Sequence, residues 1–169
     1  AGPPPPPTMP AITSSATSAA MEEASRRLLG RVLAPDAAAL FEVEVVRRDG
    51  GDSAWFEVEE GRAQGKVRLR GTDGVSVASA LNWYLRYLAK VDTSWMSKFP
   101  LQVPLPLPRV TTPLRKYSLV EWSYYENVCT FSYSQAWWDW ARWEREIDWM
   151  AMSGVNLPLA LTGQEYVVQ

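Results

Sequence analysis

The chain reads WWDWARWEREIDWM from Trp137 to Met150 and GVNLPLALTGQE from Gly154 to Glu165, and these two stretches decide its fold. The first is rich in strong helix formers and is followed by Gly154, a residue type that commonly ends helices in the left-handed conformation. The second is an almost continuous apolar run that stops at Thr162, as a buried strand does. A helix, a turn and a buried strand in this order predict one α/β unit of a parallel sheet.

The predicted helix carries apolar side chains on two sides. At about 100° per residue, one broad face collects Trp137, Trp140, Trp143, Ile147, Met150 and Ala151. The opposite side carries Trp138, Trp149 and the aliphatic stems of Arg142 and Arg145. We therefore expect two covers, one from the helix's own sheet and one from a neighbouring domain. The alternatives are an ordinary amphipathic helix with two surface tryptophans and an interfacial membrane helix, and the latter is disfavoured because acidic residues outnumber the arginines.

A short aromatic strand is predicted just upstream, over 124–130, so the order is strand, helix, strand. In β/α repeats the residues just past the carboxyl ends of the strands converge on the ligand, in closed barrels and in open sheets alike. These strand ends carry Asn127, Cys129 and Thr130, and then Thr162, Gln164 and Glu165. Amide side chains offer both a donor and an acceptor, which suits the hydroxyl and amide groups of a sugar. From spacing alone, a structural role for these residues is as good an interpretation as a ligand role.

The same region resembles a known family. The segments that carry the resemblance are YxNVCT from Tyr125, YSxxWWDWxRWEREIDWMA from Tyr133, GxNLxLA from Gly154 and GQE from Gly163. They resemble the opening of the catalytic domain of alpha-N-acetylglucosaminidases, glycoside hydrolases that act on heparan sulfate. The resemblance implies a small α/β domain, then a (β/α)8 barrel, then a helical domain. It also implies that Gln169 lies just after the second barrel strand, so that the chain is an N-terminal fragment of such an enzyme.

A mechanism is implied as well. The family is regarded as retaining: one carboxylic acid protonates the departing oxygen and a second carboxylate, about 5 to 5.5 Å away, attacks the anomeric carbon. The resemblance places both glutamates on later barrel strands, so no residue of this chain is expected to be catalytic and residues 1–169 alone are expected to be inactive. Asn127 and Cys129 match positions that line the pocket for terminal N-acetylglucosamine. Gln164 and Glu165 are assigned to the same rim or to the layer behind it.

Two other functions stay open at this point. The chain is a non-catalytic carbohydrate-binding or interaction module if the gene ends here, or a partial gene model without an independent function. Downstream coding sequence that supplies the remaining strands and the two glutamates would favour the enzyme.

The N-terminal end has a different composition. Residues 1–20 contain five consecutive prolines and then mainly Ser, Thr and Ala, which predicts a disordered tail. A helix is predicted from Met21 to Leu33 and ends before Pro35. Its apolar side is expected to consist of Ala24, Leu28, Leu29 and Val32.

Alternating apolar and polar residues then predict three strands, over 41–45, 55–59 and 66–70, in an antiparallel sheet with one solvent-exposed face. A second helix is expected over 74–90, capped by Thr72 or Asp73. The side chains expected to cover the other face of the sheet are Ala78, Leu81, Leu85 and Leu88.

Prolines make residues 101–112 a stiff connector or an edge segment. Residues 114–123 either complete the small sheet or lead directly into the first barrel strand. The expected fold is therefore α/β: a tail over 1–20, a small α+β domain over 21–113 with an antiparallel sheet covered by helices, and the first β-α-β portion of a truncated (β/α)8 TIM barrel over 114–169.

Composition argues against several classes of partner and site. A net charge of −2 disfavours nucleic acid and anionic membranes. With no histidine and one cysteine, the chain is expected to hold neither a zinc site nor a Cys-His nucleophile, and no cofactor is expected. The expected partner is a glycan ending in α-linked N-acetylglucosamine, and the complete enzyme can be an oligomer. The resemblance implies a lysosomal, vacuolar or secreted enzyme, although residues 1–20 lack the basic start and apolar core of a secretory signal.

Overall fold

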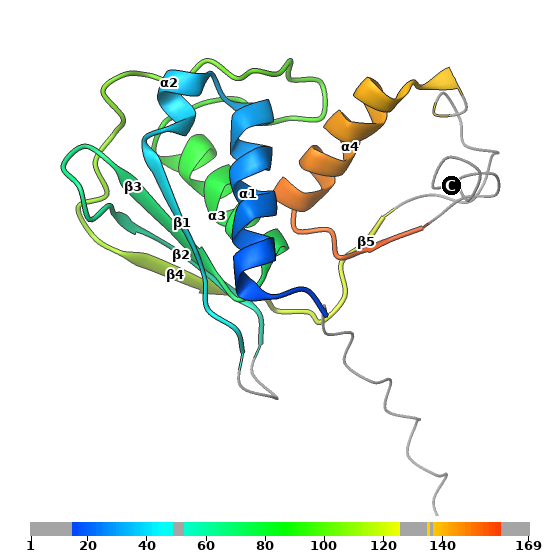
Figure 1. Cartoon of the computed structure of the whole chain (residues 1–169), viewed down its shortest axis with the longest axis horizontal. Helices are drawn as coiled ribbons and strands as arrows, with labels where there is room; N and C mark the ends of the chain where they lie inside the picture. Colours follow the sequence, from blue (N-terminus) through cyan, green and yellow to red (C-terminus); the bar gives the residue numbers. More distant parts are fainter. Residues whose placement is uncertain (1–14, 49–52, 126–134, 136, 160–169) are drawn as a thin grey trace, which may run out of the picture.

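The structure is a computed structural model and describes residues 15–48, 53–125, 135 and 137–159. Figure 1 shows two parts: a four-stranded sheet with two helices on one face, and a further helix with two short strands that lies against those helices. This is a mixed α/β fold, as the sequence predicts. Within the described residues, no helix is long and apolar enough to cross a membrane.

Helix α1 (Ser18–Val32) starts at Ser18, where Thr17 caps it by accepting a hydrogen bond from the backbone N–H of Ala20 (3.2 Å). Its buried side chains are Met21, Ser25, Leu28, Leu29 and Val32. Ala24 is exposed, so the predicted apolar side was wrong at this position. Ser25 is buried in its place because its hydroxyl donates to the carbonyl oxygen of Met21 (2.8 Å) and so needs no water. A short helix, α2 (Pro35–Ala38), follows.

The sheet contains β1 (Phe41–Val45), β2 (Trp55–Glu60), β3 (Val67–Gly71) and β4 (Leu114–Tyr117), in the order β1-β3-β2-β4. Strand β2 is antiparallel to both of its neighbours, but β1 and β3 run parallel. The prediction of an antiparallel sheet is therefore corrected for this pair. Strands β2 and β3 form a hairpin, and β3, not β2, lies beside β1. Side chains alternate between faces in parallel and antiparallel pairs alike, so the sequence pattern holds no information on direction.

Helix α3 (Gly74–Tyr87) covers the apolar face of the sheet together with α1. Of the two predicted caps, Thr72 and Asp73, Asp73 is the one that caps α3, by accepting a hydrogen bond from the backbone N–H of Ser76 (2.7 Å). The predicted side chains Ala78, Leu81 and Leu85 are buried and Leu88 is half-buried. They form one apolar cluster with buried residues of the strands, among them Val58 and Leu69.

The opposite face of the sheet carries ion pairs between arginines and glutamates on neighbouring strands. Arg70 on β3 and Arg115 on β4 both donate to the carboxylate of Glu57 on β2, each at 2.7 Å. The guanidinium of Arg115 also lies 4.2 Å from the ring centre of Trp55. Burial acts to raise the pKa of Glu57, but the hydrogen bonds and charges of the two arginines outweigh it and hold the pKa below its ordinary value. The predicted contrast between one apolar and one polar face is confirmed.

Residues 88–113 pack on the core on their way back to the sheet. Leu101, Leu107 and Val110 are buried, and the backbone N–H of Leu101 donates to the carbonyl oxygen of Val32 (2.7 Å). This segment delivers β4, which pairs with β2. Of the two alternatives for residues 114–123, the first four residues therefore complete the small sheet.

Helix α4 (Trp140–Met152) confirms the predicted helix, and Gly154 follows it with a φ of +78°, a conformation that favours glycine. Asp139 caps α4 by accepting from the backbone N–H of Arg142 (2.9 Å). Strands β5 (Tyr124–Tyr125) and β6 (Leu157–Pro158) flank the helix in sequence and pair in parallel. The predicted strand-helix-strand unit is thus present, and a barrel built on it stays a prediction.

Candidate functional site

The carboxyl ends of β5 and β6 lie side by side. Tyr125 is opposite Pro158, and the backbone N–H of Leu159 donates to the carbonyl oxygen of Tyr125 (2.5 Å). Just beyond these two points the chain continues into the predicted sugar-binding residues Asn127, Cys129, Gln164 and Glu165. Those four residues lie outside the described residues. What the structure brings together is the pair of strand ends from which both segments start.

Asn156 fixes the pairing of these strands from one side. Its side-chain oxygen accepts from the backbone N–H of Ser123 (2.7 Å), and its amide nitrogen donates to the carbonyl oxygen of Glu121 (2.8 Å). The backbone N–H groups of Asn156 and Leu157 both donate to Ser123, each at 3.2 Å. The turn after α4 is therefore bonded to the chain that enters β5, and this sets the register of the strand ends.

Glu146 fixes β5 from the side of the helix. Its side chain is 1% exposed, and its carboxylate accepts from the hydroxyl of Tyr125 (2.8 Å) and from the indole N–H of Trp95 (2.8 and 3.0 Å to the two oxygens). Arg142, one turn earlier on α4, supplies the positive charge at 3.0 Å. We call these four residues the Glu146 cluster. It joins α4, β5 and the loop after α3, so a buried charge is both neutralised and fully hydrogen-bonded.

A second buried carboxylate, Asp148, joins α4 to α1. Arg31 donates to both of its oxygens, at 2.6 and 2.7 Å, and the Asp148 side chain is 3% exposed. The hydrogen bond with Asp148 raises the pKa of Arg31, so the guanidinium stays charged. Burial raises the pKa of Asp148, because the removal of its charge from water outweighs the opposing effect of the hydrogen bond and charge of Arg31. This ion pair therefore fixes orientation more than it adds stability.

The two faces of α4 are covered differently from the prediction. On the side of the neighbouring domain, Trp138 is half-buried and packs against Trp95 and under the guanidinium of Arg142, 3.7 Å from its ring centre. That cover is confirmed for Trp138, whereas the prediction was wrong for Trp149, which packs on Tyr125 of β5 with ring centres 5.7 Å apart. The broad apolar face is corrected: Trp137, Trp140 and Ile147 are 88%, 60% and 46% exposed. The physical reason is that β5 and β6 are described over two residues each, and β5 contacts α4 through Tyr125 at Glu146 and Trp149, not at the three exposed side chains.

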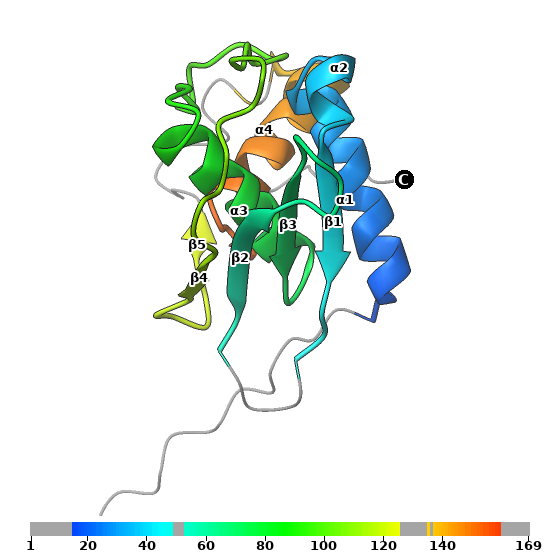
Figure 2. The same cartoon turned by 90° about the vertical axis from the view of Figure 1, so that its left-hand side faces the viewer.

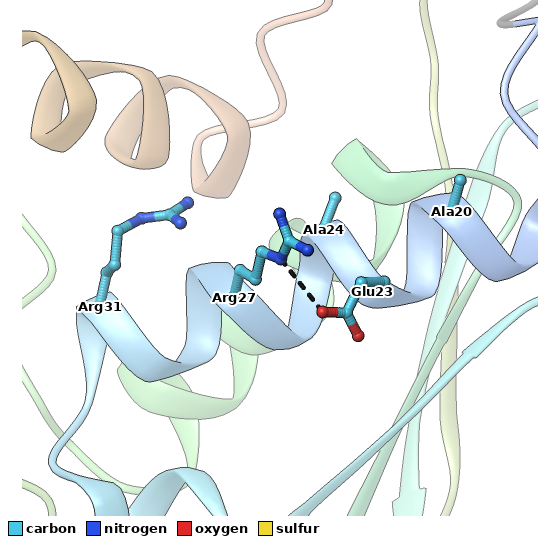
Figure 3. Close-up of a pocket in the computed structure, with 5 residues that line it drawn as sticks. All are labelled: Ala20, Glu23, Ala24, Arg27 and Arg31. Atoms are coloured by element: carbon cyan, nitrogen blue, oxygen red, sulfur yellow. Dashed lines mark hydrogen bonds and ion pairs between the residues drawn. The ribbon is translucent and has the colours of Figure 1, made fainter.

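A shallow hollow of about 350 Å³ runs along the outer side of α1 beside α4. Figure 3 shows its lining, Ala20, Glu23, Ala24, Arg27 and Arg31, with Arg31 pointing toward α4. Glu23 is the single carboxylate in this lining and is bonded to Arg27 (3.0 Å), so the hollow lacks the pair of carboxylates that glycoside hydrolysis requires. Among the described residues, no group of three or more metal-binding side chains occurs.

Comparisons with known proteins match this architecture. The model of the alpha-N-acetylglucosaminidase (NAGLU) N-terminal domain matches residues 23–109, and that of the alpha-N-acetylglucosaminidase (NAGLU) tim-barrel domain matches residues 123–169. The chain belongs to the alpha-N-acetylglucosaminidase family. Human alpha-N-acetylglucosaminidase is 46% identical over 150 residues, which cover 86% of this chain and 20% of the human protein. The chain therefore spans about a fifth of the length of this curated relative.

Solved structures of a family 89 glycoside hydrolase from Clostridium perfringens are also similar. One, in complex with 2-acetamido-1,2-dideoxynojirmycin, has a TM-score of 0.76 and 34% identity over 88% of this chain and 16% of its own. Another, a double variant in complex with its substrate GlcNAc-alpha-1,4-galactose, has the same TM-score, identity and coverage. In the alpha-N-acetylglucosaminidase family match, the barrel model begins at Ser123, the residue that bonds to the Asn156 turn. The two matches leave residues 110–122 between them, and β4 lies in this interval.

Sequence reasoning missed the Glu146 cluster and the role of Asn156. Charged residues on an amphipathic helix are ordinarily assigned to solvent, and the partners of Glu146 come from distant parts of the chain. A usable signal was present: Glu146 stands one turn after Arg142, in a helix crowded with tryptophans. An acidic residue among so many large side chains is a candidate for a buried, paired charge.

Proposed function

We propose that this chain supplies the N-terminal domain and the first β-α-β unit of the catalytic (β/α)8 barrel of an alpha-N-acetylglucosaminidase. The observation that carries the proposal is that the residues matched to a tim-barrel domain contain a parallel β5-α4-β6 unit. Parallel strands joined by a helix are the repeating unit of such a barrel. We place the domain boundary between Tyr117 and Ser123, because β4 still pairs with β2.

The proposed substrate is a glycan with a terminal α-linked N-acetylglucosamine, of the heparan sulfate type. The complex of the C. perfringens relative with GlcNAc-alpha-1,4-galactose supports this class of ligand. Asn127 and Cys129 would line the sugar pocket, and Gln164 and Glu165 would belong to its rim. The supporting geometry is that both segments start from the paired ends of β5 and β6. Placement in a lysosome, a vacuole or the secreted fraction, and assembly into oligomers, are further proposals that rest on the family alone.

The division of labour follows from the retaining mechanism. Two carboxyl groups are needed, one as acid and base and one as nucleophile. We propose that both come from strands that follow residue 169 in the complete enzyme, and that residues 1–169 contribute sugar recognition and the orientation of the first two strands. Glu146 and Asp148 are excluded as catalytic carboxylates because both are buried and bonded within the protein, to Tyr125 and Trp95 and to Arg31 respectively.

The test compares the complete enzyme with residues 1–169 on aryl α-N-acetylglucosaminide, with the β-anomer and the aryl α-glucoside as controls. We expect the complete enzyme to hydrolyse the first substrate alone and the 169-residue chain to hydrolyse none. Turnover by the 169-residue chain that disappears in Glu165→Gln would show that Glu165 is catalytic and would overturn the proposed division. A complete enzyme that prefers the β-anomer would refute the proposed activity itself.

A further inference from the structure

We propose that Glu146 is a positioning residue for sugar binding: it holds Tyr125 at the carboxyl end of β5, two residues before Asn127 in the sequence. This inference rests on the proposed function, because it assumes that Asn127 contacts the sugar. It goes beyond that function in assigning a role to a buried carboxylate on α4 that itself touches no substrate.

The carboxylate of Glu146 is fully committed inside the protein. One oxygen accepts from the Tyr125 hydroxyl and the Trp95 indole, and the other accepts from the Trp95 indole and Arg142. A buried acceptor that loses one of its donors carries an unsatisfied charge, so each donor is strongly held. The hydroxyl of Tyr125 is therefore fixed relative to α4, not merely in contact with it.

Several described contacts hold Tyr125. Glu146 binds its hydroxyl, Trp149 packs at the edge of its ring with centres 5.7 Å apart, and Leu159 bonds to its backbone carbonyl. That carbonyl is the last described point of β5, and Leu159 is the last described residue after β6. A shift of Tyr125 would therefore move the starting points of both segments that carry the proposed sugar contacts. Misplacement by a fraction of an ångström is enough to weaken binding in a polar site.

Asp148 provides a matched comparison on the same helix. Both carboxylates are buried, stand two residues apart and bind a partner in the first part of the chain. The hydrogen bonds of Asp148 go to Arg31 on α1, whereas those of Glu146 also reach β5. Removal of either carboxylate is expected to lower stability, but only removal of the Glu146 carboxylate is expected to weaken sugar binding.

The experiment uses the complete enzyme and the conservative change Tyr125→Phe, which removes one hydroxyl. We expect kcat/KM for aryl α-N-acetylglucosaminide to fall roughly tenfold, mainly through KM, with inhibition by free N-acetylglucosamine weakened to a similar degree. Asp148→Asn is the control, and we expect it to lower the melting temperature while kcat/KM changes by less than about twofold. Glu146→Gln keeps an acceptor oxygen for Tyr125 and is expected to retain more activity than Glu146→Ala.

A double-mutant cycle with Asn127→Ala tests whether Tyr125 acts through the proposed contact. We expect Tyr125→Phe to cause little further loss in the Asn127→Ala background, because the contact it positions is already gone. An equal loss in both backgrounds, or unchanged kinetics of Tyr125→Phe in an active enzyme, would overturn the positioning role while leaving the proposed function intact. Inactivity of the unmutated complete enzyme would overturn both.

Discussion

Asn127 and Asn156 are the same residue type in two different settings. Asn156 uses its side chain within the protein, bonded to Ser123 and to the carbonyl oxygen of Glu121. Asn127 lies just beyond β5 and is proposed to direct its amide to the sugar. A change of each to alanine therefore separates a folding contact from a binding contact.

We expect Asn127→Ala in the complete enzyme to lower kcat/KM by roughly 10- to 200-fold, corresponding to a loss of about 1.5 to 3 kcal/mol for a buried polar contact, with the melting temperature nearly unchanged. Asn156→Ala is expected to do the reverse and to cost roughly 1 to 2 kcal/mol of stability, because two of its hydrogen bonds are lost. Steady-state kinetics and thermal unfolding measure both. A poorly folded Asn127→Ala with normal specific activity would make the first strand end structural and the proposed sugar site wrong.

Among the elements, the charged face of the sheet predicts a particular pH dependence. The pKa of Glu57 is lowered from its ordinary value of 4.5, so its ion pairs with Arg70 and Arg115 contribute stability above that pH and lose it as the pH falls through the lowered value. Glu57→Gln is expected to cost roughly 1 to 2 kcal/mol at neutral pH and progressively less in acid. Denaturant unfolding at several pH values checks this, with Glu23→Gln as the control because its side chain is 53% exposed. A cost that stays constant down to pH 3 would show that the charge of Glu57 is irrelevant.

Truncation of apolar side chains on the two sides of helix α4 is expected to reduce stability by unequal amounts. Met152 is 2% exposed and belongs to the core cluster, whereas Ile147 is 46% exposed. We expect Met152→Ala to destabilise the chain by about 2 to 5 kcal/mol and Ile147→Ala by about 1 kcal/mol or less. Chemical unfolding of the two variants measures the difference. Equal losses would mean that the broad apolar face of α4 is covered after all, as the sequence alone suggests.

The elements also show how far the sequence could be interpreted. Local signals were sufficient for Gly154 at the end of α4, for the start of α3 to within one residue, at Thr72 or Asp73, and for the alternation in β1 to β3, because each depends on residues that are close in sequence. The parallel pairing of β1 with β3 and the burial of Glu146 and Asp148 depend on partners far along the chain. No spacing or composition encodes those partners. For the sugar site, the resemblance supplied the residues, and their side chains lie outside the described part of the chain.

At the scale of the whole molecule, the 169-residue chain is expected to be stable to different degrees along its length. Strand β3 is paired on both sides and α3 packs on it, so these elements are expected to have the slowest amide exchange. Helix α4 is expected to be intermediate, because it is held by Arg31, by Trp95 and by a hydrogen bond from Asn82 to the carbonyl oxygen of Met152 (2.8 Å). Strands β5 and β6 are expected to exchange fastest and to make the chain prone to aggregation. Hydrogen exchange with strongest protection over 155–161 would contradict this order.

The order of strands in the sheet has a consequence for the chain during its synthesis. In Figure 2, the sheet is seen in front of α4, with β3 between β1 and β2. Strand β1 is synthesised before β3, the strand with which it pairs. Its edge therefore stays unpaired until the β2–β3 hairpin has been made. Unpaired strands invite association between nascent copies. In this interval Glu44 lacks its later partners Arg68 and Arg70, and Glu42 lacks its hydrogen bonds from the backbone of Arg62 and Ala63. Both carboxylates would then repel the same residues of a second copy. The same carboxylates that stabilise the finished sheet therefore oppose association of nascent chains before the sheet is complete.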